Sequence, residues 1–520
     1  MNKSGVVKNF SIVAIIAIFS KVFGFLRDAL VSYVYGASAI TDAFNIVQFL
    51  PNFLFMVIHQ AVVVGFIPVF LKIRHEDKNE SNGFVQFGVL IFTLISSLLC
   101  LLLFLFPSFW IKVFAGGFDE NTALLTMQML RYSSWALMLQ SVVVMFSAYL
   151  NALKKFIIPA CLGFILDISV VVCLFLSNGI HKPYILGLAP LLTMIIESLV
   201  LFISAFKNGF RFTTSFRGQS KNFVEMLKVS LPSIIALGIS QLNYYVDKNI
   251  SSNYAAGSIS SLSLSNNIIN AVEVIIVSSL ATVLYTEFSK LESENKKQDA
   301  VGLMSETFNK LMVFLIPASI LIFVCSEPIV RVLYGHGSFN SDNIYTTSNC
   351  LKFYSFGMPF LGVSTIVVRY FYSIKKAKYV VMSSILSLLT NILGDVIVWK
   401  FTDFGVGALA AVTSLSFAVN CLSLLFFLMK NKRTSIAIDY PFFFVLYGLS
   451  FICGMIAYLP SKLMGALLYG LAACLTCAIT FAVLLIPMLL FYLKYSNPKL
   501  YSDVLIKINV FRKKKQNNTK

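Results

Sequence analysis

The sequence predicts an all-α protein with many membrane-spanning helices, because composition, run length and loop length agree. Of its 520 residues, 58% are hydrophobic and 12% are charged, whereas an average soluble domain has about 25% charged residues. The apolar residues gather in runs such as 84–110, and a helix needs about 20 such residues to cross a bilayer. Short loops between the runs leave no room for a large soluble domain.

Fourteen spans can be placed along the chain, and the basic residues orient them. Lysine and arginine collect at the N-terminus, in every second loop and in the tail after the last span, while the intervening loops are nearly bare. Because short cytoplasmic loops retain basic residues, both termini are predicted to be cytoplasmic. Beside a last span, the basic tail predicts contact with the inner leaflet rather than with nucleic acid. The spans are 8–35, 42–71, 84–110, 123–150, 156–177, 184–206, 225–249, 259–286, 309–334, 350–373, 378–399, 405–429, 440–459 and 464–494.

An internal repeat indicates two similar halves. The pattern at 130–132 with 154–155 recurs at 351–353 with 375–376, at a constant offset of 221 residues. Spans one to six therefore match spans seven to twelve, and both copies run in the same direction, as in transporters built from two parallel repeats. The predicted divisions are a six-helix lobe at 1–222, a second lobe at 223–433, a terminal helix pair at 434–496 and a basic cytoplasmic tail at 497–520.

Ionisable residues at membrane depth are candidate sites, since they are costly there unless they face a cavity or a partner. Lys21 and Arg27 lie six residues apart in the first span, roughly 240° around a helix, so they do not share a face. Both can border a wide cavity, or Arg27 can pair with Asp28 or Asp42 as a structural bridge. The single acids Asp167, Glu197 and Glu273 are equally consistent with structural pairing and with function.

A second polar cluster is predicted in the C-terminal half. Asn391 and Asp395 are four residues apart and share a helix face, while Asp247 and Thr413 belong to two other spans. Their oxygen atoms are the ligand type that a hard cation such as Na⁺ prefers. Hydrogen bonding between neighbouring helices explains the same residues equally well.

No motif for covalent chemistry is present: the chain has no phosphate-binding glycine loop with its lysine, no zinc motif and no serine elbow. We therefore expect a transporter rather than an enzyme, with no cofactor apart from a possible coupling Na⁺. Without a nucleotide-binding domain, transport is expected to be passive or driven by an ion or by the membrane potential.

Several motifs resemble one known family. The segment 21–28 (Lys-Val-Phe-Gly-Phe-Leu-Arg-Asp), then Thr41-Asp42, Pro51-Asn52 and 332–339 (Val-Leu-Tyr-Gly-His-Gly-Ser-Phe) are similar to the MurJ (MviN) lipid II flippases. The likeness covers spans one to twelve, and fourteen spans is the family's number. It implies the fold of the multidrug/oligosaccharidyl-lipid/polysaccharide superfamily, with two six-helix lobes around a cationic cavity and a terminal helix pair that forms a groove for a lipid tail.

The resemblance also implies residue roles and a substrate. Asp247, Asn391, Asp395 and Thr413 match positions implicated in sodium binding. Phe55, Met56 and Asn267 stand where the family usually has arginines, so the cavity is expected to be less cationic. The residues carried over to the substrate cavity are Lys21, Arg27, Asp42, Asn52 and Asn267.

The expected function is the movement of an undecaprenyl-pyrophosphate-linked saccharide, first of all lipid II, to the outer leaflet of a bacterial cytoplasmic membrane by alternating access. Its partners would be this substrate and membrane lipids, not nucleic acid, and the protein would act as a monomer. The alternatives are a flippase for a capsule, exopolysaccharide or O-antigen unit, and an ion-coupled drug antiporter.

Overall fold

The computed structural model describes residues 3–213, 218–430 and 440–465, together with a few residues between 475 and 487. These residues are almost entirely helical and contain no strand. The predicted all-α class is therefore confirmed. The predicted basic tail and most of the second helix of the terminal pair lie outside the described residues.

The first half of the chain forms a bundle of long and short helices. Its loops supply the caps: Asp119 accepts hydrogen bonds from the backbone of Asn121 and Thr122 at the start of one helix. The Thr122 hydroxyl also donates to Asp119 and lowers the pKa of that carboxyl. The helices are α1 (Lys3–Tyr35), α2 (Ala39–Ala61), η1 (Val62–Phe66), α3 (Ile67–Glu76), α4 (Lys78–Leu105), α5 (Pro107–Phe114), α6 (Glu120–Ser133), α7 (Ala136–Ala152), α8 (Ile157–Ala160), α9 (Leu162–Gly179), η2 (Pro183–Leu188) and α10 (Ala189–Lys207).

The second half repeats this arrangement and adds a further helix. Its elements are α11 (Gln219–Ser251), α12 (Ser258–Glu273), η3 (Val274–Ser278), α13 (Ser279–Ser293), α14 (Lys297–Val324), α15 (Ser326–Tyr334), α16 (Ser341–Ser373), α17 (Ala377–Phe401), α18 (Gly407–Met429) and α19 (Tyr440–Gly465). The helix α19, the first of the predicted terminal pair, packs against α14.

Nine helices of the described chain are long and apolar enough to cross a membrane, or ten if α6 and α7, bent by 48° at their junction, form one span. The helices α1 and α11 have 33 residues each and are about 50 Å long, which also exceeds a bilayer core. A polytopic membrane protein is confirmed, whereas the number fourteen stays a prediction.

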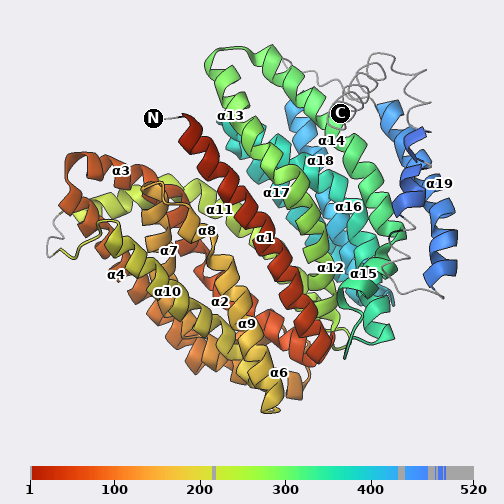
Figure 1. Cartoon of the computed structure of the whole chain (residues 1–520), viewed down its shortest axis with the longest axis horizontal. Helices are drawn as coiled ribbons and strands as arrows, with labels where there is room; N and C mark the ends of the chain where they lie inside the picture. The colour runs from red at the N-terminus through yellow and green to blue at the C-terminus, as the bar shows by residue number, and fades with distance from the viewer. Residues whose placement is uncertain are drawn as a thin grey trace, which may run out of the picture.

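A small third cluster joins α14 to α19, and two large hydrophobic cores fill the two halves. One is built almost wholly from residues of α2 to α10, and the other from residues of α11 to α19. In Figure 1 the helix α1 runs towards α15 between the first group and most of the second, while α11 lies on the side of the first group. The helix α11 packs against α2 at one side and against α17 at the other, so it connects the halves physically as well as along the chain.

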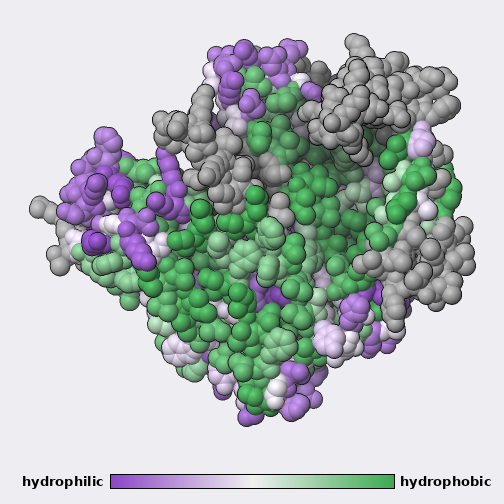
Figure 2. All heavy atoms as spheres, viewed as in Figure 1, coloured by the Kyte–Doolittle hydropathy of each residue, from purple (hydrophilic) through white to green (hydrophobic). Residues whose placement is uncertain are grey.

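The surface matches a bilayer. Figure 2 shows hydrophobic residues in a broad belt around the middle of the molecule and hydrophilic residues at both ends. A small hydrophilic area interrupts the belt near its centre. Polar groups are stable at that depth only if they face a cavity or one another. This central hydrophilic area is therefore the candidate location of a functional site.

Candidate functional site

The helix α1 packs along α9, and this contact determines which way the charged side chains of α1 point. Gly163 has no room for a side chain, since a Cβ there would lie 2.4 Å from the Ser20 hydroxyl. One turn further, Phe23 and Phe164 meet edge to face with 5.2 Å between ring centroids. Arg27 follows on the same face of α1, four residues after Phe23, and therefore points towards α9.

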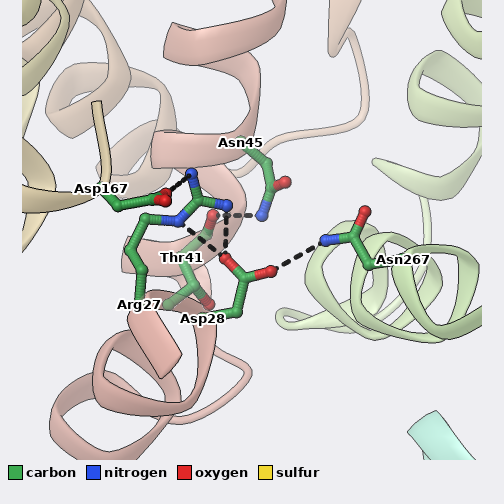
Figure 3. A network of polar contacts seen from close by, with 6 residues as sticks. All are labelled: Arg27, Asp28, Thr41, Asn45, Asp167 and Asn267. Atoms are coloured by element: carbon green, nitrogen blue, oxygen red, sulfur yellow. Dashed lines mark hydrogen bonds and ion pairs between the residues drawn. The ribbon is translucent and has the colours of Figure 1, made fainter. Parts of the chain in front are cut away.

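Arg27 is paired with two carboxylates (Figure 3). Its Nε and Nη2 donate to Oδ1 of Asp28 at 3.0 and 2.7 Å, and its Nη1 lies 3.1 Å from Oδ1 of Asp167 in α9. Across the lobe boundary, Asn267 of α12 donates to the other oxygen of Asp28 at 2.9 Å. The guanidinium has five N–H donors, and these contacts engage at least three of them.

The observed pairing of Arg27 decides between the two interpretations left open by the sequence, a structural bridge and a place beside a cavity. Arg27 pairs with Asp28, as one alternative expected, but its second partner is Asp167 and not Asp42. Because Arg27 also lines a cavity between the lobes, the structural and the cavity-lining interpretations hold together. Asp167 was visible in the sequence only as a single acid within an apolar run, and no spacing rule connected it with Arg27.

Lys21 lies apart from this network. Its side chain is exposed, and no carboxylate of the described residues lies within ion-pair distance of it. It precedes Asp28 by seven residues, so the two share a helix face, and it lies about 9 Å along α1 from Arg27. Lys21 is thus a cation without a direct ion pair among the described residues, nearer the N-terminal end of the bundle, and its charge still acts on Asp167.

The cavity beside Arg27 has a volume of about 70 Å³ and lies between α1, α2 and α12. Its wall is rich in amides and hydroxyls, and the Nε2 of Gln48 is buried without a hydrogen-bond partner. Amide and hydroxyl groups bind phosphate oxygens, which need donors, and sugar hydroxyls, which need both donors and acceptors. The lining residues are Arg27, Asp28, Val31, Ser32, Gly36, Thr41, Phe44, Asn45, Gln48, Ser260, Ser263, Leu264 and Asn267.

Asp42 lies deeper than this lining and joins the lobes. It is buried in α2 and accepts hydrogen bonds from the backbone N–H of Gly257 and from the N–H and hydroxyl of Ser260, all at 2.7 Å. These groups belong to the first turn of α12, where free N–H groups and the helix dipole favour an anion. We call Asp42, Gly257 and Ser260 the clasp.

Glycine allows further close contacts around the clasp, at the end of the bundle away from the N-terminus. Gly337 (φ 64°) and Gly257 (φ 92°) both adopt left-handed backbone conformations. A Cβ would lie 2.3 Å from the Tyr33 carbonyl oxygen at Gly337, and 2.4 Å from the Ala37 carbonyl oxygen at Gly257. Ser338 also donates its backbone N–H to Tyr33 at 2.8 Å. The lobes are therefore in backbone contact at this end.

The four residues predicted as a cation site come together in the second lobe. Asn391 donates to Asp247 at 3.1 Å, and the Thr413 hydroxyl donates to the other oxygen of Asp247 at 3.3 Å. Asn391 and Asp395 are fully buried, and Asp247 and Thr413 nearly so. The sequence placed these residues on three spans, and the structure brings α11, α17 and α18 together around them.

The oxygen atoms of this cluster are incompletely satisfied. Both carboxylate oxygens of Asp395 and the amide oxygen of Asn391 are buried and accept no hydrogen bond from the residues that the structure describes. Lys248, the neighbour of Asp247, forms no direct ion pair with it in the described chain: its ammonium donates to Ser263 at 3.3 Å and lies 5.5 Å from the ring centre of Phe49. Buried carboxylate oxygens without donors need either a proton or a bound positive charge, and the oxygen-rich set fits a small hard cation as the second of these.

The remaining predicted positions lie away from the cavity wall. Asn52 is exposed, donates to the Gln48 carbonyl and accepts from Gln140, each at 2.8 Å. Phe55 is fully buried in the core of the first lobe, and Met56 lies 4.0 Å from the position of a Cβ on Gly238 in α11. The chain therefore presents no cation at any of the three positions where the family resemblance expects arginine.

Comparison with known proteins identifies the relatives of this architecture. The sequence profile described as "Lipid II flippase MurJ" matches residues 31–493. The chain belongs to the lipid II flippase MurJ family. A probable lipid II flippase MurJ from Aquifex aeolicus is 29% identical over 465 residues, 86% of each chain. One from Buchnera aphidicola of Schizaphis graminum is 26% identical over 416 residues, 79% of this chain and 81% of the relative.

Solved structures agree with this family. A lipid II flippase MurJ in an inward closed conformation superposes with a TM-score of 0.73 at 25% identity, covering 91% of this chain and 97% of the other. An inward-facing MATE family multidrug transporter gives 0.68 at 12% identity, over 80% and 95% of the two chains. The predicted superfamily fold is thus confirmed, and the chain is a membrane transporter rather than an enzyme.

Proposed function

We propose that this protein translocates a polyprenyl-pyrophosphate-linked saccharide, first of all lipid II, from the inner to the outer leaflet of the bacterial cytoplasmic membrane. The observation that carries the proposal is the polar cavity at the lobe boundary, with Arg27 in its wall and the cation Lys21 further along α1. Family membership supports the substrate class, since the relatives are named as probable lipid II flippases.

The direction of transport follows from the basic loops. With both termini in the cytoplasm, the clasp lies at the outer end, and the state described here is closed to the outside. An inside-negative membrane potential favours outward movement of an anion by about 2.3 kcal/mol per charge per 100 mV. The polyprenyl tail would stay in lipid beside α19, which packs on the outside of the second lobe.

A cation bound among Asp247, Asn391, Asp395 and Thr413 is the second part of the proposal. Its support is the set of buried oxygens without donors. Na⁺ would link α11, α17 and α18, and would bias transport by the difference in its affinity between the two states of the cycle. No other cofactor is proposed, and the protein is proposed to act as a monomer.

A related capsule or exopolysaccharide unit is the second candidate substrate. The observation in its favour is the absence of cations at Phe55, Met56 and Asn267, because lipid-linked units with fewer charges need fewer arginines. The shared requirement is a pyrophosphate that enters between the lobes. A drug antiporter is disfavoured by the family of the chain, whose relatives are named as probable lipid II flippases.

The test is complementation of a strain depleted of its own lipid II flippase. The double variant Lys21→Ala/Arg27→Ala is expected to abolish growth and to leave lipid II inaccessible at the outer face. A matched control, Lys310→Ala/Lys400→Ala, removes two exposed cations outside the cavity and should complement fully. Full complementation by the first variant would refute the role of these cations. Failure of the wild type, in a strain where a relative succeeds, would favour the capsule substrate.

A further inference from the structure

Asp167 is a carboxylate at membrane depth with a single charged partner in contact. Its side chain is 7% exposed and lies in the α1–α9 interface, against the Nη1 of Arg27 at 3.1 Å. Figure 3 shows it on the far side of the guanidinium from Asn267, so it holds Arg27 towards the first lobe. The cavity lining includes Arg27 and Asp28 but not Asp167.

The charge of Arg27 is already compensated by carboxylates. Two of them, Asp28 and Asp167, share one guanidinium, and the residue at the lobe boundary is the neutral Asn267. Together with Lys21, whose charge also acts on Asp167, the group is neutral. An anion that enters the cavity therefore meets a cation whose charge is already compensated.

We propose that Asp167 is a specificity-determining residue: it is an internal counter-anion that the substrate must displace from Arg27. This inference rests on the proposed function and deepens it. Asp28 holds the guanidinium through two N–H groups and stays bound, whereas Asp167 holds only the Nη1 edge. That edge becomes available to a phosphate when the ion pair between Asp167 and Arg27 breaks. Arginine binds phosphate oxygens with two parallel hydrogen bonds.

The exchange discriminates by charge. A phosphodiester headgroup carries one negative charge, the same as Asp167, so replacing one by the other gains little Coulomb energy. It also leaves Asp167 buried and unpaired, which is costly. A pyrophosphate carries at least two negative charges and gains enough attraction from Arg27 and Lys21 to offset that cost. Asp167 thereby excludes the abundant phospholipids of the same membrane.

The experiment measures binding to the purified full-length chain in detergent. The probes are geranylgeranyl pyrophosphate and dioctanoyl phosphatidylglycerol, each titrated against the wild type, Asp167→Asn and the matched control Glu197→Gln. Glu197 is another buried acid of the first lobe, on α10 and without a described ion pair to Arg27. The cost of displacing Asp167 is common to both ligands, so its removal should strengthen the binding of both. Asp167→Asn is expected to strengthen phosphatidylglycerol binding at least tenfold over the wild type. Glu197→Gln should leave both dissociation constants at their wild-type values.

Two results overturn different claims. If the wild type binds the pyrophosphate no better than Lys21→Ala/Arg27→Ala does, the proposed anionic substrate is wrong. If the wild type does bind it, but Asp167→Asn binds phosphatidylglycerol no better than the wild type or weakens pyrophosphate binding, Asp167 only positions Arg27 and the inference is wrong. Should Asp167→Asn fail to fold, Asp167→Ser removes the same charge, and the same dissociation constants decide.

Discussion

The clasp can be broken by one substitution, Asp42→Asn, which keeps the size of the side chain and removes its charge. Asp42 accepts three hydrogen bonds of 2.7 Å from Gly257 and Ser260 across the lobe boundary. A hydrogen bond to a charged group contributes about 1.5–3 kcal/mol, and a buried charge at a helix terminus contributes up to about 2 kcal/mol. Asparagine keeps an acceptor oxygen but loses the charge and presents an N–H₂ group to donors.

We therefore expect Asp42→Asn to destabilise the closed end of the bundle at the clasp by about 2–4 kcal/mol. Since about 1.4 kcal/mol is a factor of ten, the ratio of closed to open molecules should fall by roughly 30-fold to several hundred-fold. The substitution should therefore enrich a state that is open at this end.

The assay is a distance measurement between spin labels at Glu120 and Asp342. Both are exposed at the closed end, one in each lobe, and the labels require prior replacement of the nine native cysteines. In Asp42→Asn a longer distance should gain population. The control is Asp119→Asn, which removes a carboxylate at the same end that caps α6 within one lobe. An unchanged distance distribution in Asp42→Asn would refute the clasp argument, and an equal change in both variants would show that it is not specific.

Three further outcomes follow from the same contacts. Melting temperature should rise with Na⁺ but not with choline at equal ionic strength, and Asp395→Ala should abolish that difference while Asp403→Ala, in an exposed loop, should keep it. Gly257→Ala should open the clasp end in the same distance assay, because the new Cβ would lie 2.4 Å from the carbonyl oxygen of Ala37. The control is Gly209→Ala, which has a similar positive φ but whose Cβ meets nothing within 4 Å. Asn267→Arg should restore a cation beside Asp28 and tighten binding of geranylgeranyl pyrophosphate at least tenfold, as measured by titration; unchanged affinity would show that the charge around Arg27 does not limit binding.

Local patterns in the sequence predicted the fold and part of the site. Apolar run length predicted the helices, and the spacing of Asn391 and Asp395 correctly placed both on one helix face beside Asp247. The different faces of Lys21 and Arg27 also followed from helical geometry. These predictions succeed because they depend on residues close in the chain, or on a repeat that fixes which helices are neighbours.

Contacts between distant helices could not be predicted in this way. Nothing local connects Arg27 with Asp167, which is 140 residues further along the chain, since their meeting depends on the register between α1 and α9. Asp42 is a similar case. Its position after a loop without basic residues was compatible with a place in the cavity wall. Only the packing of α12 against α2 brings Gly257 and Ser260 close enough to donate hydrogen bonds to its carboxylate oxygens.

The cavity and the clasp share groups, and this links what enters the cavity to the state of the clasp. Asn45 lines the cavity and donates to the Ser260 hydroxyl at 3.2 Å, while that hydroxyl donates to Asp42. A phosphate or sugar oxygen that takes the Asn45 N–H, or competes for the Ser260 hydroxyl, alters a contact on which closure depends. A ligand shifts a conformational equilibrium only through contacts that differ between the two states. Ser260 provides such a contact because it belongs to the cavity wall and to the clasp at once. The cavity is therefore placed where an occupant can act on the lobe boundary directly, without any intermediate chain of residues.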